Sequence, residues 1–119
     1  LDSLSNSNTI DRHFCIFDEI YSGTNPSEAI ASAYSFLNFI AKYKNLDYIL
    51  TTHYVSLCKL LEKNKNITNK QMKILDNNST YKLKKGISDI KGGIKVLKEL
   101  DYDEIIIKGA NEIIDKINI

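Results

Sequence analysis

The chain has 119 residues, which is enough for one small domain with a single hydrophobic core. Its net charge of +1 argues against a dedicated nucleic-acid-binding module, because such modules are usually clearly basic. Hydrophobic residues make up 43% of the chain and charged residues 26%, an ordinary globular composition, and no apolar run approaches the roughly 20 residues that span a bilayer.

The chain opens with a polar segment and continues into an apolar one. Residues 1–12, LDSLSNSNTIDR, are rich in serine and asparagine, and we expect a helix end followed by a loop. Residues 13–17, HFCIF, form a short, nearly continuous apolar run. Such a run is typical of a strand that is buried on both faces, as in a parallel sheet.

A helix is predicted over residues 26–42. Asn25 can act as its N-cap, Pro26 suits the first helical position, and Glu28 stands where a capping-box acid belongs. Apolar residues then recur at helical spacing and define one face, namely Ile30, Ala33, Tyr34, Leu37, Ile40 and Ala41.

A second buried strand is predicted within residues 46–54, LDYILTTHY, and a short helix over residues 55–63. The order strand, helix, strand is a βαβ unit, whose two strands are parallel and joined by a right-handed crossover. The carboxyl ends of 13–17 and 47–52 should therefore be neighbours in one sheet.

The second half of the chain changes in pattern. Residues 67–75 and 80–87 alternate loosely between apolar and polar, and the turn DNNS at 76–79 separates them. Together they predict an antiparallel hairpin on a sheet edge. Two helices should follow. The first closes near Leu97 and Leu100, and Asp103 can cap the second, whose apolar face consists of Ile106, Ala110, Ile113, Ile114 and Ile117.

Two acids, Asp18 and Glu19, follow the first strand directly. In a parallel sheet, side chains at the carboxyl ends of strands face the crevice where ligands bind. Because adjacent strand residues point to opposite faces, the two acids should reach different partners. One can hold Mg²⁺ through its water shell while the other polarises an attacking water. The end of the second strand places His53 near them, where an imidazole can reach a terminal phosphate oxygen.

Simpler readings stay open at this point. The acids can be solvated or cap a following helix, and His53 can be packed at a strand end. A zinc site built from His13, Cys15, His53 and Cys58 has spacings that match no usual zinc pattern. A nucleophilic pair of Cys15 with His53 is disfavoured because Cys15 lies inside the apolar run, where a thiol is inert.

Three ordered blocks resemble one known family. FDEIYSGTNPSEAIASAYSFLNFIA, then YILTTHYVSL, then STYKLKKGISDIKGGIKVLKELDYDEIIIKGANEII resemble the C-terminal part of the ATPase domain of the MutS family. That family carries out DNA mismatch recognition and related recombination tasks with an ABC-type ATPase. The resemblance covers nearly the whole chain from about residue 13 and implies an α/β fold: part of a P-loop NTPase sheet with a parallel βαβ core, an edge hairpin and a C-terminal helix-turn-helix.

The resemblance also implies residue roles. Asp18 would be the Walker B carboxylate on Mg²⁺, through water, and Glu19 the catalytic base. His53 would be the switch histidine on the γ-phosphate of ATP. The segment SGTNP resembles the D-loop, which meets the ATP site of the partner subunit, and its candidate binding residues are Ser22, Gly23, Thr24 and Asn25. The final helices resemble the family's helix-turn-helix, which supports dimerisation rather than reading DNA.

Two departures from the family pattern matter. Members usually carry a basic residue just before the glycine of the D-loop block, whereas this chain has Tyr21 and Ser22. No G-x-x-x-x-G-K-[ST] motif occurs, so the phosphate-cradling Walker A loop is absent, and the ABC signature would lie upstream of Leu1. Residues 1–85 therefore read as the second half of an ATPase domain, and residues 86–119 as a dimerisation element.

The expected function is that of part of a MutS-like mismatch repair ATPase, which uses ATP and Mg²⁺ to drive clamp changes on mismatched double-stranded DNA. The fragment alone should be inactive. Its partner would be a second MutS-like subunit, with no membrane association. The chain starts with leucine and has no secretory signal, so we expect a piece of a longer intracellular protein, in the nucleus or cytoplasm according to the organism. The alternative is a dimerisation fragment with a degenerate ATP site.

Overall fold

The computed structural model describes residues 11–76, 78–89 and 92–117, so the helix end expected within 1–12 lies almost wholly outside the described residues. The chain divides into two compact units, Leu1–Ser88 and Asp89–Ile119, and each is described by itself. The sequence placed the division three residues earlier, between 85 and 86. Within the described ranges, no helix is both long and apolar enough to cross a membrane.

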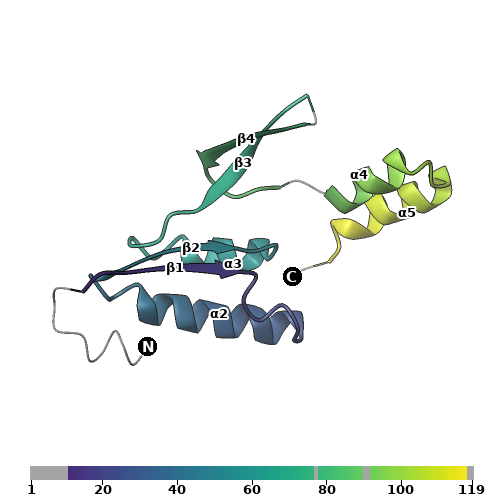
Figure 1. Cartoon of the computed structure of the whole chain (residues 1–119). Coiled ribbons are helices and arrows are strands. Elements are labelled where there is room, and N and C mark those ends of the chain that lie inside the picture. Colours follow the sequence, from purple (N-terminus) through teal and green to yellow (C-terminus); the bar gives the residue numbers. More distant parts are fainter. Residues whose placement is uncertain (1–10, 77, 90–91, 118–119) are drawn as a thin grey trace. The chain divides into compact units, whose positions relative to one another are not determined.

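The first unit is built on two parallel strands (Figure 1). Strand β1 spans His13–Asp18 and β2 spans Leu46–Thr51, and they pair in parallel from His13 opposite Leu46 to Asp18 opposite Thr51. The prediction that these two segments are parallel neighbours is confirmed. Strand β2 ends earlier than the 46–54 segment, so residues 52–54 lie beyond it.

Helix α2, Pro26–Ile40, connects the two strands and begins where the sequence predicts. The Asn25 side chain accepts a hydrogen bond from the Ser27 amide at 2.9 Å, which satisfies one of the free N–H groups of the first turn. Glu28 is in the first turn, but its carboxylate accepts a hydrogen bond from the Thr24 hydroxyl at 3.3 Å. The acid therefore ties the helix to the preceding loop.

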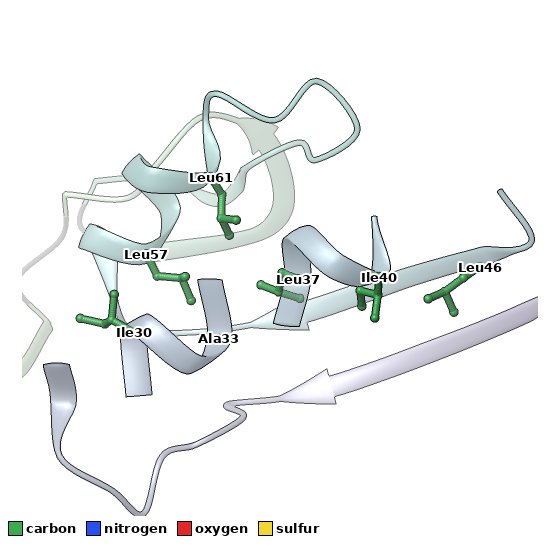
Figure 2. Packing of buried hydrophobic residues seen from close by; sticks show 7 residues of the cluster. All are labelled: Ile30, Ala33, Leu37, Ile40, Leu46, Leu57 and Leu61. Atoms are coloured by element: carbon green, nitrogen blue, oxygen red, sulfur yellow. The ribbon is translucent and has the colours of Figure 1, made fainter. Parts of the chain in front are cut away.

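Helix α3, Val55–Leu61, follows β2 and packs with α2 over one face of the sheet. Figure 2 shows the side chains that meet there, which come from α2, α3 and the start of β2: Ile30, Ala33, Leu37, Ile40, Leu46, Leu57 and Leu61. Burying such aliphatic side chains stabilises the fold by about 1.5–3 kcal/mol each. Alternate strand residues reach this cluster, among them Cys15 and Phe17 from β1 and Tyr48 and Leu50 from β2.

The other face of the sheet is open, which corrects the expectation that these strands are buried on both faces. Phe14 is 62% exposed, Ile16 73% and Ile49 56%, and exposure alternates along both strands. The physical reason is that α2 and α3 contribute to a single core cluster on one face, so no described residue of the first unit covers the other face.

The expected hairpin forms, but not on the edge of the parallel sheet. Strand β3, Lys70–Leu75, pairs antiparallel with β4, Asn78–Lys85, in a separate two-stranded sheet. The two strands satisfy each other's inner backbone groups, so the hairpin can form without pairing to β1 or β2. A register shift between Met72 and Ile74 marks an irregularity, and Tyr81 opposite it adopts a positive φ of 57°.

The second unit is a pair of helices, α4 over Gly92–Glu99 and α5 over Glu104–Ile114. Asp103 caps α5 as predicted, because its side chain accepts from the Ile105 amide at 2.9 Å. Ile117 lies beyond the end of α5, and none of the residues of this helix is buried. The apolar face of α5 thus stays largely accessible.

Candidate active site

The carboxyl ends of β1 and β2 lie side by side and carry the residues that the sequence singles out. Asp18 is the last residue of β1 and stands opposite Thr51, the last residue of β2. Glu19 follows β1 directly, and His53 follows β2 after one intervening residue. This edge therefore gathers two carboxylates, a hydroxyl and an imidazole.

Asp18 lies on the open face of the sheet. Its Oδ1 accepts a hydrogen bond from the Thr51 hydroxyl at 2.5 Å. The side chain is exposed, and the structure gives no other protein partner to its carboxylate in the described residues. One oxygen is thus held in place, while the rest of the carboxylate is available to water or to an ion.

Glu19 leaves the strand in an uncommon backbone conformation, with φ at 51° in the left-handed region. Its amide donates to the Thr51 carbonyl at 3.0 Å, which continues the strand pairing by one residue. Its side chain reaches His53, with Oε1 2.5 Å from Nε2. The side chains of the two acids therefore contact different partners: that of Asp18 contacts Thr51, and that of Glu19 contacts His53.

His53 sits in the turn between β2 and α3 rather than in the strand. The turn is closed by Thr52, whose hydroxyl accepts a hydrogen bond from the Tyr54 amide at 3.0 Å. The His53 side chain is 87% exposed, whereas that of Glu19 is 40% exposed. The imidazole is therefore held by Glu19 and otherwise faces solvent.

The loop from Glu19 to Asn25 connects the acids to α2. Backbone hydrogen bonds run from the Ser22 amide to the Glu19 carbonyl at 3.3 Å and from the Thr24 amide to the Tyr21 carbonyl at 3.4 Å. A side chain at Gly23 would meet open space, and φ there is not in the left-handed region. Neither sterics nor backbone conformation within the described residues requires glycine at this position.

The histidines and cysteines do not converge on one point. His13 opens β1 and His53 follows the far end of β2, so the length of the sheet separates them. Cys15 packs toward the core, and within the residues the structure describes there is no metal-competent group of three or more His, Cys, Asp and Glu. Burial raises the pKa of the Cys58 thiol, helped by the nearby Glu62 carboxylate and opposed by a backbone hydrogen bond. This favours the unreactive thiol form.

A second shifted group also lies outside the acid cluster. Burial raises the pKa of the Tyr48 hydroxyl, and this oxygen has no hydrogen-bond partner among the residues that the structure describes. Tyr48 points into the core, where its ring lies 6.1 Å from that of Phe17. It is therefore part of the packing, and not of the open edge where the acids lie.

The arrangement can do two things chemically. A carboxylate beside a hydroxyl is an oxygen-only donor set of the kind that Mg²⁺ prefers, and the exposure of Asp18 leaves room for the waters that this ion retains. A carboxylate in contact with an imidazole can accept a proton from water and share it. Sequence reasoning missed Thr51. Aligning the two predicted strands in parallel would have placed it opposite Asp18.

The chain matches known proteins over most of its length. The family model for MutS domain V matches residues 4–118. The chain is 28% identical over 112 residues to the DNA mismatch repair protein MutS of Persephonella marina, a match covering 91% of this chain and 13% of that protein. It is 34% identical over 103 residues to the endonuclease MutS2 of Finegoldia magna, covering 85% of this chain and 13% of that protein.

A further relative shows the same proportions. The endonuclease MutS2 of Clostridium kluyveri is 33% identical over 108 residues, covering 89% of this chain and 14% of that protein. The chain therefore spans about one eighth of the length of the curated relatives that it matches. These relatives carry two different names, so the matches point to the family and not to one branch of it.

Proposed function

This chain belongs to the MutS family, in the C-terminal part of its domain V, and from that premise we propose that it is the second half of an ABC-type ATPase domain. In the full-length protein this half would act in Mg²⁺-dependent ATP hydrolysis that drives clamp changes on mismatched DNA. The observation that carries the proposal is the meeting of Asp18, Glu19 and His53 at the carboxyl edge of two parallel strands.

Asp18 is the residue that would hold Mg²⁺. Mg²⁺ usually keeps several waters and binds through one or two carboxylates together with substrate phosphates, so a single exposed carboxylate is an adequate protein ligand. When bound, the ion neutralises charge on the phosphate oxygens. The Asp18 carboxylate would orient the water shell of the ion, and its hydrogen bond from Thr51 limits the rotation of the carboxylate.

Glu19 is the residue that would activate the attacking water. Its carboxylate contacts His53 Nε2, whereas that of Asp18 contacts the Thr51 hydroxyl. In this role Glu19 would take a proton from the water while the water oxygen forms a bond to the terminal phosphorus. The bond from that phosphorus to the bridging oxygen would break, and ADP would leave. His53 is exposed on its other side, so its ring can reach a phosphate oxygen while Glu19 orients it.

The open sheet face supports the idea that other residues complete this domain. All-parallel sheets are normally covered on both faces, yet Phe14, Ile16 and Ile49 are exposed here. Contiguous exposed apolar residues on a sheet mark a surface that binds another part of a protein. We propose that the phosphate-binding half of the ATPase domain covers this face.

The loop from Ser22 to Asn25 is proposed to contact the ATP site of the partner subunit. Its shape is fixed from within, because Asn25 caps α2 and the Thr24 hydroxyl donates to Glu28. Ser22 and Gly23 are exposed and are not required by packing in this chain. They are thus free to face a second subunit, which the helix pair α4–α5 would bring close.

A second candidate function is a dimerisation element with a degenerate ATP site. The accessible apolar face of α5, a helix in which no residue is buried, favours it. Under this proposal α4 and α5 would carry the function, and the acids would be solvated residues at a strand end.

We predict that the isolated 119-residue chain does not bind ATP appreciably. Most of the nucleotide affinity in such sites comes from backbone N–H groups and a lysine that surround the phosphates, and this chain lacks that loop. Calorimetry with Mg²⁺ and ATP should show no saturation up to roughly 1 mM ATP. A Kd of that size would correspond to a binding free energy of about −4 kcal/mol. Tight Mg²⁺-dependent binding by this chain alone would disprove the half-domain proposal.

The experiment that separates the two functions is Asp18→Asn in the full-length protein. The amide keeps the shape of the side chain but loses the charge that holds the water shell of Mg²⁺. The Mg²⁺ concentration needed for half-maximal nucleotide binding should rise by about ten-fold or more. Fluorescence of a labelled ATP analogue at increasing Mg²⁺ measures it.

Asp47→Asn is the matched control for this experiment. Asp47 is also a carboxylate on the open face, but it lies at the other end of β2 and contacts only Arg12, at 2.9 Å, among the interactions described. Exposed pairs of this kind contribute little to stability, so the Mg²⁺ dependence should stay unchanged. Equal Mg²⁺ dependence in Asp18→Asn and wild type would instead favour the degenerate-site function.

A further inference from the structure

We propose that Thr51 is a positioning residue that fixes both acids at the edge of the sheet. This inference rests on the proposed function, because it gives Thr51 a role through Asp18 and Glu19. Thr51 uses two different atoms for the two acids. Its hydroxyl donates to Asp18 Oδ1 at 2.5 Å, and its carbonyl accepts from the Glu19 amide at 3.0 Å.

The strand register explains why Thr51 can serve both acids. Thr51 stands directly opposite Asp18 in the parallel pair, so its side chain emerges on the same open face. Its carbonyl points across the sheet edge to the next residue, Glu19, as a continuation of the ladder. No other described residue makes a hydrogen bond to both acids.

The hydroxyl contact matters because Asp18 is otherwise unrestrained. An exposed carboxylate rotates among several rotamers, and ordering it on ion binding has an entropic cost. A hydrogen bond from Thr51 occupies Oδ1 and selects one orientation in advance, leaving the other oxygen for the Mg²⁺ water shell. Such preorganisation improves affinity without a new contact to the ion.

The neighbouring threonine has a different role, which makes the assignment specific. The Thr52 hydroxyl accepts from the Tyr54 amide and so stabilises the turn that carries His53. A β-branched residue suits a strand position in any case, and valine would suit position 51 equally well in shape. What valine cannot supply is the O–H donor to Asp18.

The test compares Thr51→Val with Thr51→Ser in the full-length protein. Valine keeps the β-branched shape and the backbone bond to Glu19 but removes the donor, whereas serine retains the donor. In Thr51→Val the Mg²⁺ concentration for half-maximal binding of a fluorescent ATP analogue should rise about ten-fold. We expect the low end of the roughly 10–100-fold range for outer-shell residues, because Asp18 and Thr51 are both exposed.

Thr51→Ser should stay close to the wild-type midpoint. Thr80→Val is the matched control, because Thr80 is also a strand threonine with a donating hydroxyl, bonded to the Lys73 carbonyl at 2.7 Å in the hairpin. It should leave the Mg²⁺ midpoint unchanged. If Thr51→Val unfolds below the assay temperature, Thr51→Ala is compared with Thr51→Ser instead. This pair also differs in the hydroxyl donor, and both side chains are smaller than valine.

Two results would overturn the inference. One is a Thr51→Val midpoint equal to wild type, and the other is a Thr51→Ser midpoint as high as that of Thr51→Val. Asp18→Asn is measured alongside. If Asp18→Asn shifts the midpoint and Thr51→Val does not, the Thr51 role is wrong and the proposed function stands. If Asp18→Asn has no effect, the proposed function itself is wrong.

Discussion

Replacing Glu19 with glutamine in the full-length protein is expected to lower ATP turnover by about 10²-fold or more while ATP still binds. Glutamine has the shape of glutamate and keeps an oxygen that can accept a hydrogen bond from His53 Nε2, the atom that Glu19 contacts in the structure. It cannot take a proton from water at neutral pH. General-base action is worth roughly 10²–10⁴-fold, and that is the factor that should be lost.

The expected consequence is an accumulated ATP-bound state. In the proposed site, ATP binding would depend on Asp18 and on the phosphate loop of the other half-domain, and this substitution would leave both intact. Nucleotide should therefore hold the two subunits together without being hydrolysed. Asp18→Asn should differ in kind, since it weakens Mg²⁺-dependent binding before any chemistry takes place.

Single-turnover hydrolysis of labelled ATP measures the effect, with sedimentation in the presence of ATP to detect the trapped dimer. Glu62→Gln is the matched control, because Glu62 is an exposed glutamate at the end of α3, away from the acid edge, and its loss should leave the rate unchanged. Hydrolysis by Glu19→Gln at the wild-type rate would show that Glu19 is a structural residue of the strand end.

The elements that the sequence predicted well are those determined by local chemistry. Asn25 and Pro26 indicate the start of α2, and Asp103 indicates the start of α5. A helix N-cap needs only a side-chain acceptor near the free amides of the first turn, so it can be recognised locally. The parallel pairing of β1 with β2 followed from two apolar runs joined by a helix of sufficient length. No long-range information was needed for either.

The features that the sequence did not predict depend on contacts between segments. An apolar run such as HFCIF is compatible with a strand that is covered on one face or on both faces. The exposure of Phe14 and Ile16 therefore could not be predicted from the run itself. The hairpin's separation from the parallel sheet depends on which edges meet. The bond from Thr51 to Asp18 depends on the register of two strands 33 residues apart, which composition does not encode.

Ile113→Asp in the full-length protein is expected to weaken dimerisation by about 3 kcal/mol, roughly a 100-fold rise in Kd. Ile113 is 51% exposed and Ile117 is 52% exposed, and α5 buries none of its residues. An apolar stripe of this kind usually marks an interface. An aspartate placed there would lose its hydration on association and find no compensating partner, and Ile117→Asp should act in the same direction.

ATPase activity should fall together with dimerisation. The loop from Ser22 to Asn25 is proposed to act on the ATP site of the second subunit, so a monomer would lack that contact. Asn111→Asp is the matched control. This substitution also adds an acid in the final turns of α5, so any effect of the added charge on the helix itself should be the same as in Ile113→Asp. Position 111 lies roughly opposite Ile113 around the helix, so the isoleucines of the apolar stripe stay in place.

Sedimentation and circular dichroism together decide among the outcomes. A folded, monomeric Ile113→Asp protein beside a dimeric Asn111→Asp protein is the expected result and identifies the stripe as the subunit interface. A melted Ile113→Asp protein would mean that Ile113 is core in the full-length protein, covered there by residues outside this chain. A folded Ile113→Asp protein that still dimerises with wild-type Kd would refute the interface, because a buried, unpaired carboxylate cannot leave an apolar contact unaffected.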